Sequence, residues 1–89
     1  MNTTTSQDQA MTPKIGQRWV DLDKRNKSRR ELVLTQEVTT TRQSRGKPQA
    51  AFECVIYRDG AATGTTCVVR ADRLRPHSSG YSYVGEGAP

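Results

Sequence analysis

The sequence has few of the residues from which proteins build catalytic and metal sites. It contains one histidine, His77, and two cysteines, Cys54 and Cys67, among 89 residues. A structural zinc site needs four ligands, which one imidazole and two thiols do not supply. His77 lies in the loop-like segment PHSSG, where adjacent serines do not make a triad and no oxyanion loop is evident. Glycine-rich phosphate-binding motifs are absent too. We therefore expect no enzyme activity, no metal and no cofactor.

Long apolar runs are also missing. None approaches the roughly 18 residues that a membrane-spanning helix requires, so we expect no membrane partner. The opening MNTTTSQDQA has neither the basic nor the apolar region of a signal peptide, which favours a cytoplasmic location. In that reducing compartment the two cysteines are expected to be buried thiols, with a disulfide as the alternative.

Aromatic residues are scarce, with one Trp, one Phe and three Tyr. Trp19 lies in a predicted strand and is interpreted as a core residue, with a surface position as the alternative. Tyr57 is the better candidate for an exposed platform on which a base stacks, because it alternates with the apolar positions of its strand and adjoins Arg58. So few aromatics favour contacts to a phosphate backbone over reading of single-stranded sequence.

Basic residues, in contrast, are abundant. The chain carries 14 Lys and Arg against 9 Asp and Glu, a net charge of +5. They gather in two predicted loops, KRNKSRR and TRQSRGKPQ, and the members are Lys24, Arg25, Lys27, Arg29 and Arg30 in the first loop and Arg42, Arg45 and Lys47 in the second. Because the first and second connections of a small barrel can lie close together, we expect a continuous basic rim that attracts polyanions. Charge that only aids solubility is the plain alternative.

The apolar pattern predicts one all-β domain over residues 14–84. Strands are expected at 15–22, 31–40, 50–57, 65–71 and 80–84, with a 3₁₀ turn in DRLRP before the last one. Five short strands with a long first connection predict a small, partly open SH3-like barrel, since closure protects strand edges. The rival OB-fold would need longer strands and usually a helix. Residues 1–13 are expected to form a disordered tail and 85–89 a flexible C-terminus.

Asp59-Gly60 predicts a hairpin between the third and fourth strands. A turn centred between Gly60 and Ala61 makes residues whose numbers sum to 121 face each other. Cys54 should then oppose Cys67, Phe52 should oppose Val69 and Ile56 should oppose Thr65. Both sulfurs would lie on the inward face, where cysteine behaves as a small hydrophobe.

Asp21 and Asp23 alternate on one face of the first strand and its continuation. We expect these carboxylates to orient arginines, such as Arg25 or the distant Arg73 and Arg75; a carboxylate pair or half a metal site is the alternative. Arg73 is in turn expected to form an ion pair with Asp72 or Asp21.

Three short motifs carry a resemblance to a family. They are Gly16-x-x-Trp19-x-Asp21-x-Asp23-x-Arg25, Asp72-Arg73-x-Arg75-Pro76 and Gly80-Tyr81. Together they resemble a family of short, uncharacterised proteins of actinobacteria and their phages, over about residues 15–84. The resemblance implies a compact β-domain and a phage or mobile-element setting, and it implies no activity. The strand layout is more distantly similar to the KOW and Tudor types of SH3-like module, an analogy that concerns fold alone.

These observations predict a small basic module that binds nucleic acid, DNA in the first place, with little sequence specificity. The expected contact residues are Lys24, Arg25, Lys27, Arg29, Arg30, Arg42, Arg45, Lys47, Tyr57 and Arg58. The alternative is a protein-interaction module, such as a phage-type modulator of a host protein, that docks on an acidic surface. An exposed Trp19 or exposed tyrosines would favour the alternative, because protein interfaces use aromatic anchors.

Overall fold

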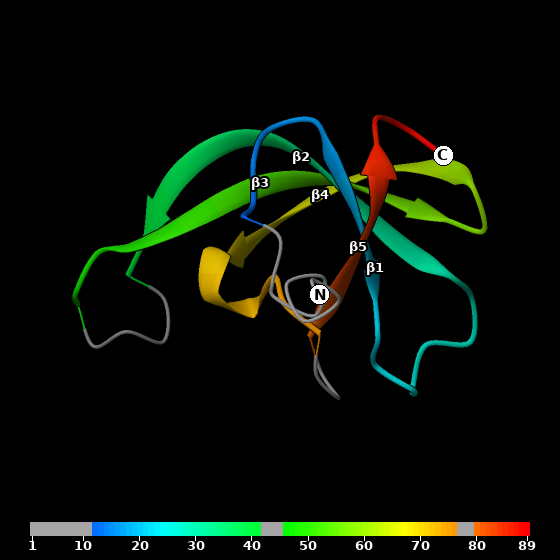
Figure 1. The fold of residues 1–89 in the computed structure, drawn as a ribbon, viewed down its shortest axis with the longest axis horizontal. Helices are drawn as coiled ribbons and strands as arrows, with labels where there is room; N and C mark the ends of the chain where they lie inside the picture. The colour runs from blue at the N-terminus through cyan, green and yellow to red at the C-terminus, as the bar shows by residue number, and fades with distance from the viewer. Residues whose placement is uncertain (1–11, 42–45, 77–79) are drawn as a thin grey trace, which may run out of the picture.

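The computed structural model describes residues 12–41, 46–76 and 80–89 as five strands and one 3₁₀ turn. These elements are β1 (Gln17–Asp21), β2 (Arg30–Thr40), β3 (Gln49–Arg58), β4 (Ala61–Arg70), η1 (Ala71–Arg73) and β5 (Tyr81–Glu86). The strands form one antiparallel sheet in the order β4-β3-β2-β1-β5, so the last strand returns beside the first (Figure 1). This arrangement confirms the all-β, SH3-like class with a 3₁₀ turn before the last strand. No helix within the described ranges has the length and apolarity to span a membrane.

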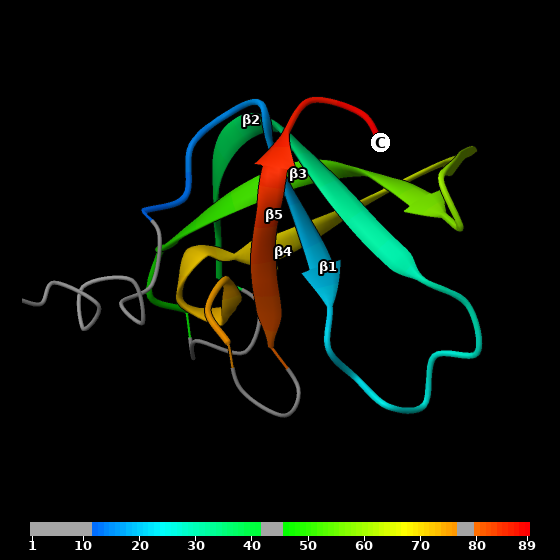
Figure 2. The same cartoon turned by 45° about the vertical axis from the view of Figure 1, so that its right-hand side comes forward.

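The sheet curls because β2 is long and irregular. Its pairing with β3 shifts between Leu34 and Gln36, which leaves Thr35 as an extra residue in the ladder. The Thr35 hydroxyl donates to the Glu53 carbonyl at 2.9 Å, so the irregularity keeps a hydrogen bond. A bulge of this kind bends a strand and increases its twist. As a result β1 and β5 cross β3 and β4 at a steep angle and cover the concave side of the sheet (Figures 1 and 2).

The core lies between these two parts of the sheet. It is built from Trp19, Leu32, Leu34, Phe52, Cys54, Val69, Leu74 and Tyr81. Trp19 is fully buried, as interpreted from the sequence. Its indole Nε1 donates to Gln17 Oε1 at 3.1 Å, and its ring meets Tyr83 edge-on at 5.8 Å between centroids. The chain's largest side chain is therefore satisfied inside the fold and offers no surface anchor.

The β3–β4 hairpin confirms the predicted pairing of the cysteines, but its turn lies at a different position from the predicted one. Cys54 faces Cys67 and Phe52 faces Val69. The turn itself, however, consists of Asp59 and Gly60, both with positive φ (49° and 86°), as in a two-residue type I′ hairpin. Arg58 consequently pairs with Ala61, and an irregularity between Val55 and Tyr57 restores the expected register farther along. The predicted pair of Ile56 and Thr65 is therefore wrong: the Ile56 carbonyl accepts from the Thr63 hydroxyl at 2.8 Å.

The last strand reaches farther toward the C-terminus than predicted. β5 continues to Glu86, two residues beyond the predicted limit of the domain. The Gly87 amide then donates to the Gly16 carbonyl at 2.7 Å, and Arg18 Nη1 donates to the Gly87 carbonyl at 2.8 Å. The predicted flexible segment 85–89 thus begins inside β5, and its flexibility stays a prediction. Most of the predicted N-terminal tail, residues 1–11, lies outside the described residues.

Candidate nucleic-acid interface

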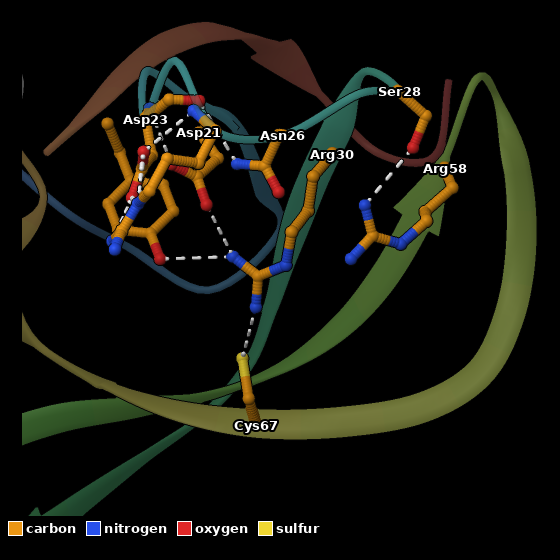
Figure 3. A network of polar contacts seen from close by, with 9 residues as sticks. Asp21, Asp23, Asn26, Ser28, Arg30, Arg58 and Cys67 are labelled. Carbon is orange, nitrogen blue, oxygen red and sulfur yellow. Dashed lines mark hydrogen bonds and ion pairs between the residues drawn. The ribbon is translucent and has the colours of Figure 1, made fainter. Parts of the chain in front are cut away.

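One end of the sheet brings together the β1–β2 loop and the β3–β4 turn. The Asp59 amide donates to the Arg29 carbonyl at 2.8 Å, and the Arg29 amide donates to Asp59 Oδ1 at 2.9 Å. Arg58 Nη1 donates to the Ser28 hydroxyl at 3.1 Å (Figure 3). We call the exposed cations of this loop and turn the loop patch: Lys24, Arg25, Lys27, Arg29 and Arg58.

Short-range hydrogen bonds give the β1–β2 loop a defined course. Asp21 Oδ1 accepts from the Asp23 amide and Asp23 Oδ1 accepts from the Arg25 amide, both at 2.9 Å. The Asn26 amide donates to the Asp23 carbonyl at 3.2 Å. Aspartate side chains commonly bond the backbone two residues ahead and so shape turns. The loop therefore presents its cations from a shaped backbone.

Three charges of the loop patch, those of Lys24, Lys27 and Arg58, are not paired with a carboxylate among the described residues, and we call them uncommitted. Lys24 and Lys27 are the simplest cases. Both side chains are exposed. Neither forms a hydrogen bond or an ion pair with any residue in the described part of the chain. Arg58 is exposed as well, and its contact with Ser28 leaves its charge without a carboxylate partner among the ion pairs of the described residues. These three groups can bind an external anion without first giving up an internal one.

Arg25 and Arg29 are exposed, but each already forms an ion pair with a carboxylate. Arg25 Nη2 contacts Asp23 Oδ2 at 2.7 Å and its Nε contacts Asp23 Oδ1 at 3.1 Å, a bidentate pair. The side-chain hydrogen bonds and the amide of Arg25 lower the pKa of Asp23 to about 2. Arg29 Nη2 lies 3.2 Å from Glu31 Oε2. The expectation that Asp23 orients Arg25 is confirmed.

Arg30 lies inside the fold and not in the loop patch. Its Nη1 contacts Asp21 Oδ2 at 2.8 Å and the Tyr81 hydroxyl at 3.2 Å. Its Nη2 donates to Cys67 Sγ at 3.7 Å (Figure 3). Only 16% of the side chain is exposed, so its prediction as a phosphate contact is not supported by its placement. Asp21 thus orients Arg30.

Lys47 is the member of the second predicted cluster that the structure describes, and it lies away from the loop patch. β2 and β3 pair over their whole length, from Arg30 with Arg58 to Thr40 with Gln49. Lys47, two positions before β3 begins, is therefore at the opposite end of the hairpin from the loop patch, up to about 30 Å of strand away. The expected continuous rim is wrong for Lys47. Arg42 and Arg45 lie outside the described residues.

Tyr57 is half-buried and is not an open platform. It pairs with Glu31 on one side and with Ala62 on the other. Among the described residues, the exposed large hydrophobics are Ile15 and Val68, and neither is aromatic. The candidate interface is therefore polar and cationic, and base stacking is a minor part of what it offers.

Two neighbours of the site were not predictable as such from the sequence. Glu31 is 3% exposed and lies between Arg29 and Arg18, whose Nε is 3.4 Å from the carboxylate. Asp59 carries a turn signal, but nothing in the sequence links it to Arg29, thirty positions earlier. Both contacts join residues from different strands or loops, which local pattern does not reveal.

The comparisons with known proteins returned no matching family model, curated protein or solved structure. The resemblance to the short proteins of actinobacteria and their phages stays a prediction, and the site rests on its own geometry.

Proposed function

We propose that the protein is a small nucleic-acid-binding module that contacts the phosphates of DNA through the loop patch. The observation that carries the proposal is the segregation of side chains at this end of the sheet. Five cations are exposed on the loop and turn, while Trp19 and the rest of the aromatic core are buried. Phosphate contacts position a protein on a duplex without selecting sequence, and exposed Lys and Arg make such contacts.

The ion pairs set the expected strength of binding. Lys24, Lys27 and Arg58 meet no carboxylate among the described residues. Arg25 and Arg29, in contrast, are each paired with an internal carboxylate that competes with a phosphate. About three phosphate contacts are therefore expected, fewer than the length of the basic run suggests. Non-specific binding with so few contacts falls at a dissociation constant of about 10⁻⁴ M at physiological salt, the weak end of the usual range.

The β1–β2 loop is hydrogen-bonded to the β3–β4 turn, which favours binding because the loop needs little further ordering when a ligand binds. The two hydrogen bonds between Arg29 and Asp59 and the contact between Arg58 and Ser28 join the loop to a tight hairpin. Groups that are already positioned lose less conformational entropy when a ligand binds. The protein-interaction alternative would need an apolar or aromatic anchor on this surface. The described part of the loop and turn offers none, so no specific observation favours it.

A salt titration tests the proposal. Binding of a fluorescent DNA duplex is measured by anisotropy at several salt concentrations, for the wild type and for Lys24→Ser/Lys27→Ser. Losing two phosphate contacts should reduce the slope of log K against log salt by about 1.8. The matched control is Lys14→Ser/Arg75→Ser, which removes two exposed cations outside the loop patch and should leave most of the slope intact.

Equal losses in the two variants would show that the net charge, and not the loop patch, drives binding. If the wild type binds no DNA at low salt and retains a protein partner after nuclease treatment of a lysate, the protein-interaction alternative replaces the proposal.

A further inference from the structure

The two cysteines form a cross-strand pair with an arginine beside one of them. Cys54 in β3 and Cys67 in β4 are direct partners in the antiparallel ladder. Arg30 of β2 reaches over this pair, and its Nη2 is 3.7 Å from Cys67 Sγ (Figure 3). The three groups come from three neighbouring strands, so the sheet itself fixes their geometry.

The two thiols differ in accessibility. Cys54 is fully buried, and its Sγ also lies 3.4 Å from the Phe52 carbonyl. Cys67 is partly exposed, because β4 is an edge strand that, among the described strands, pairs with β3 alone. A small reagent can therefore reach Cys67 before Cys54.

The surroundings of Cys67 favour its thiolate. The neighbouring Cys54 thiol lowers the pKa of Cys67 to about 7, and the Arg30 guanidinium acts in the same direction against the effect of burial. The charged and titratable groups that face the sulfur are Cys54, Arg30, Asp21 and Tyr81. Asp21 opposes the shift, but Arg30 lies between its carboxylate and the sulfur. A thiolate, and not a thiol, is the nucleophile in cysteine chemistry.

We propose that Cys67 is a site of reversible oxidation by hydrogen peroxide, with Cys54 as the resolving thiol. The Cys67 thiolate attacks one peroxide oxygen; the S–O bond forms, the O–O bond breaks, and hydroxide leaves and takes a proton from solvent. Cys54 then gives up its proton and attacks Cys67 sulfur; the S–S bond forms and the sulfenic oxygen leaves as water. Two thiols lose two electrons in total, and peroxide is reduced to two waters.

The register explains why such a disulfide would be reversible. Facing residues of an antiparallel pair have β-carbons about 4.5–5.5 Å apart. A relaxed disulfide places them about 3.5–4.5 Å apart, so β4 must move slightly toward β3. An edge strand allows this movement, and a strained disulfide is more easily reduced. The pair is thus suited to being opened again by a thiol reductant.

Peptide mapping by mass spectrometry tests the order of events without any variant. The folded protein is treated with limiting iodoacetamide, and we expect carboxamidomethylation of Cys67 well before Cys54. Treatment with hydrogen peroxide should then produce an intramolecular Cys54–Cys67 disulfide, seen as the loss of two hydrogens and reversed by dithiothreitol. First modification of Cys54, or oxidation of Cys67 to sulfinic acid without a disulfide, would overturn the proposal.

Two variants separate the roles. Cys54→Ser should stop at a sulfenic acid on Cys67 that dimedone captures, whereas Cys67→Ser should give no dimedone adduct. Cys54→Ala serves in place of Cys54→Ser if circular dichroism shows that the serine variant is unfolded. Arg30→Gln should slow alkylation of Cys67 about fivefold near neutral pH, because a smaller share of the sulfur is thiolate. An unchanged rate in folded Arg30→Gln would remove the arginine from the proposed site. None of these readouts uses nucleic acid, so they are independent of the proposed function.

Discussion

Two ion pairs of this small domain have almost the same length and opposite surroundings. Arg30 and Asp21 are 2.8 Å apart, with side chains 16% and 10% exposed. Arg25 and Asp23 are 2.7 Å apart, with side chains 89% and 24% exposed. The first pair lies among Tyr81 and Cys67 on the inner side of the sheet, and the second lies in the loop. Distance alone would rank them as equals.

Burial decides what each pair does. In water, an exposed pair gains little because solvent and salt screen it, and its members stay available to an outside ion. A pair removed from water is strongly coupled, and loss of one partner leaves an uncompensated charge behind. Adjacent positions of one basic run can therefore serve the interior and the surface. A run of charges in a sequence is not yet a charged surface.

The stability of two matched variants tests this contrast most strongly. Asp21→Asn and Asp23→Asn each remove one negative charge and keep a side-chain oxygen for the amide two residues ahead. We expect Asp21→Asn to lower the free energy of unfolding by about 3 kcal/mol, since Arg30 is left as a buried charge. Asp23→Asn should leave the urea midpoint unchanged within error. Equal midpoints for the two variants would show that the Arg30 pair is as weakly coupled as the loop pair.

The same two variants should rank in the opposite order in DNA binding. Asp23→Asn frees the guanidinium of Arg25 for a phosphate, so the slope of log K against log salt should steepen by up to about 0.9. Asp21→Asn has the same net charge, yet Arg30 still faces Tyr81 and Cys67, so its slope should stay near that of the wild type. Anisotropy titrations on folded protein measure both. A gain in both variants would mean that overall charge controls binding.

Much of the fold follows from local pattern in the sequence. The alternation of Leu32 and Leu34 predicts the strand that becomes β2, and Leu74 fills the core after the 3₁₀ turn as expected. The predicted pairing of Cys54 with Cys67 is correct, even though the turn is centred between Asp59 and Gly60 and not between Gly60 and Ala61 as predicted. The wrong turn centre does not change this pairing, because β4 carries an irregularity around Gly64, whose φ of +80° suits glycine.

The site is less predictable because it depends on which ends and faces meet. Arg29 and Arg30 are neighbours in the sequence. Arg30, however, begins β2 and points inward, where it pairs with Asp21 of the adjacent strand β1. Glu31 is buried, and both Arg18 of β1 and Arg29 reach its carboxylate. A continuous rim does not follow from two basic loops in one barrel, since a hairpin places its own loop at the far end from the preceding connection.

The smallest expected effect, and the most local one, is on the titration of Asp23. Arg25 holds the pKa of this carboxyl at about 2 against an ordinary value of 3.8. Because the pKa is lowered in the folded state, the favourable interaction is fully present above the unfolded value and is lost as the pH falls through about 2. Arg25→Ser should raise the pKa of Asp23 toward 3.8 but not fully, since the residue-25 amide still donates to Asp23 Oδ1.

Carboxyl titration by NMR measures the Asp23 shift directly. Arg29→Ser is the matched control: it also removes an exposed arginine of the loop patch, but one that contacts Glu31 and leaves Asp23 untouched. The pKa of Asp23 should be the same in this control as in the wild type. If Arg25→Ser leaves it unchanged as well, the backbone of the loop, and not the guanidinium, stabilises the carboxylate. Arg25 would then have no internal partner to give up, and it would join Lys24, Lys27 and Arg58 as a fourth uncommitted cation of the loop patch.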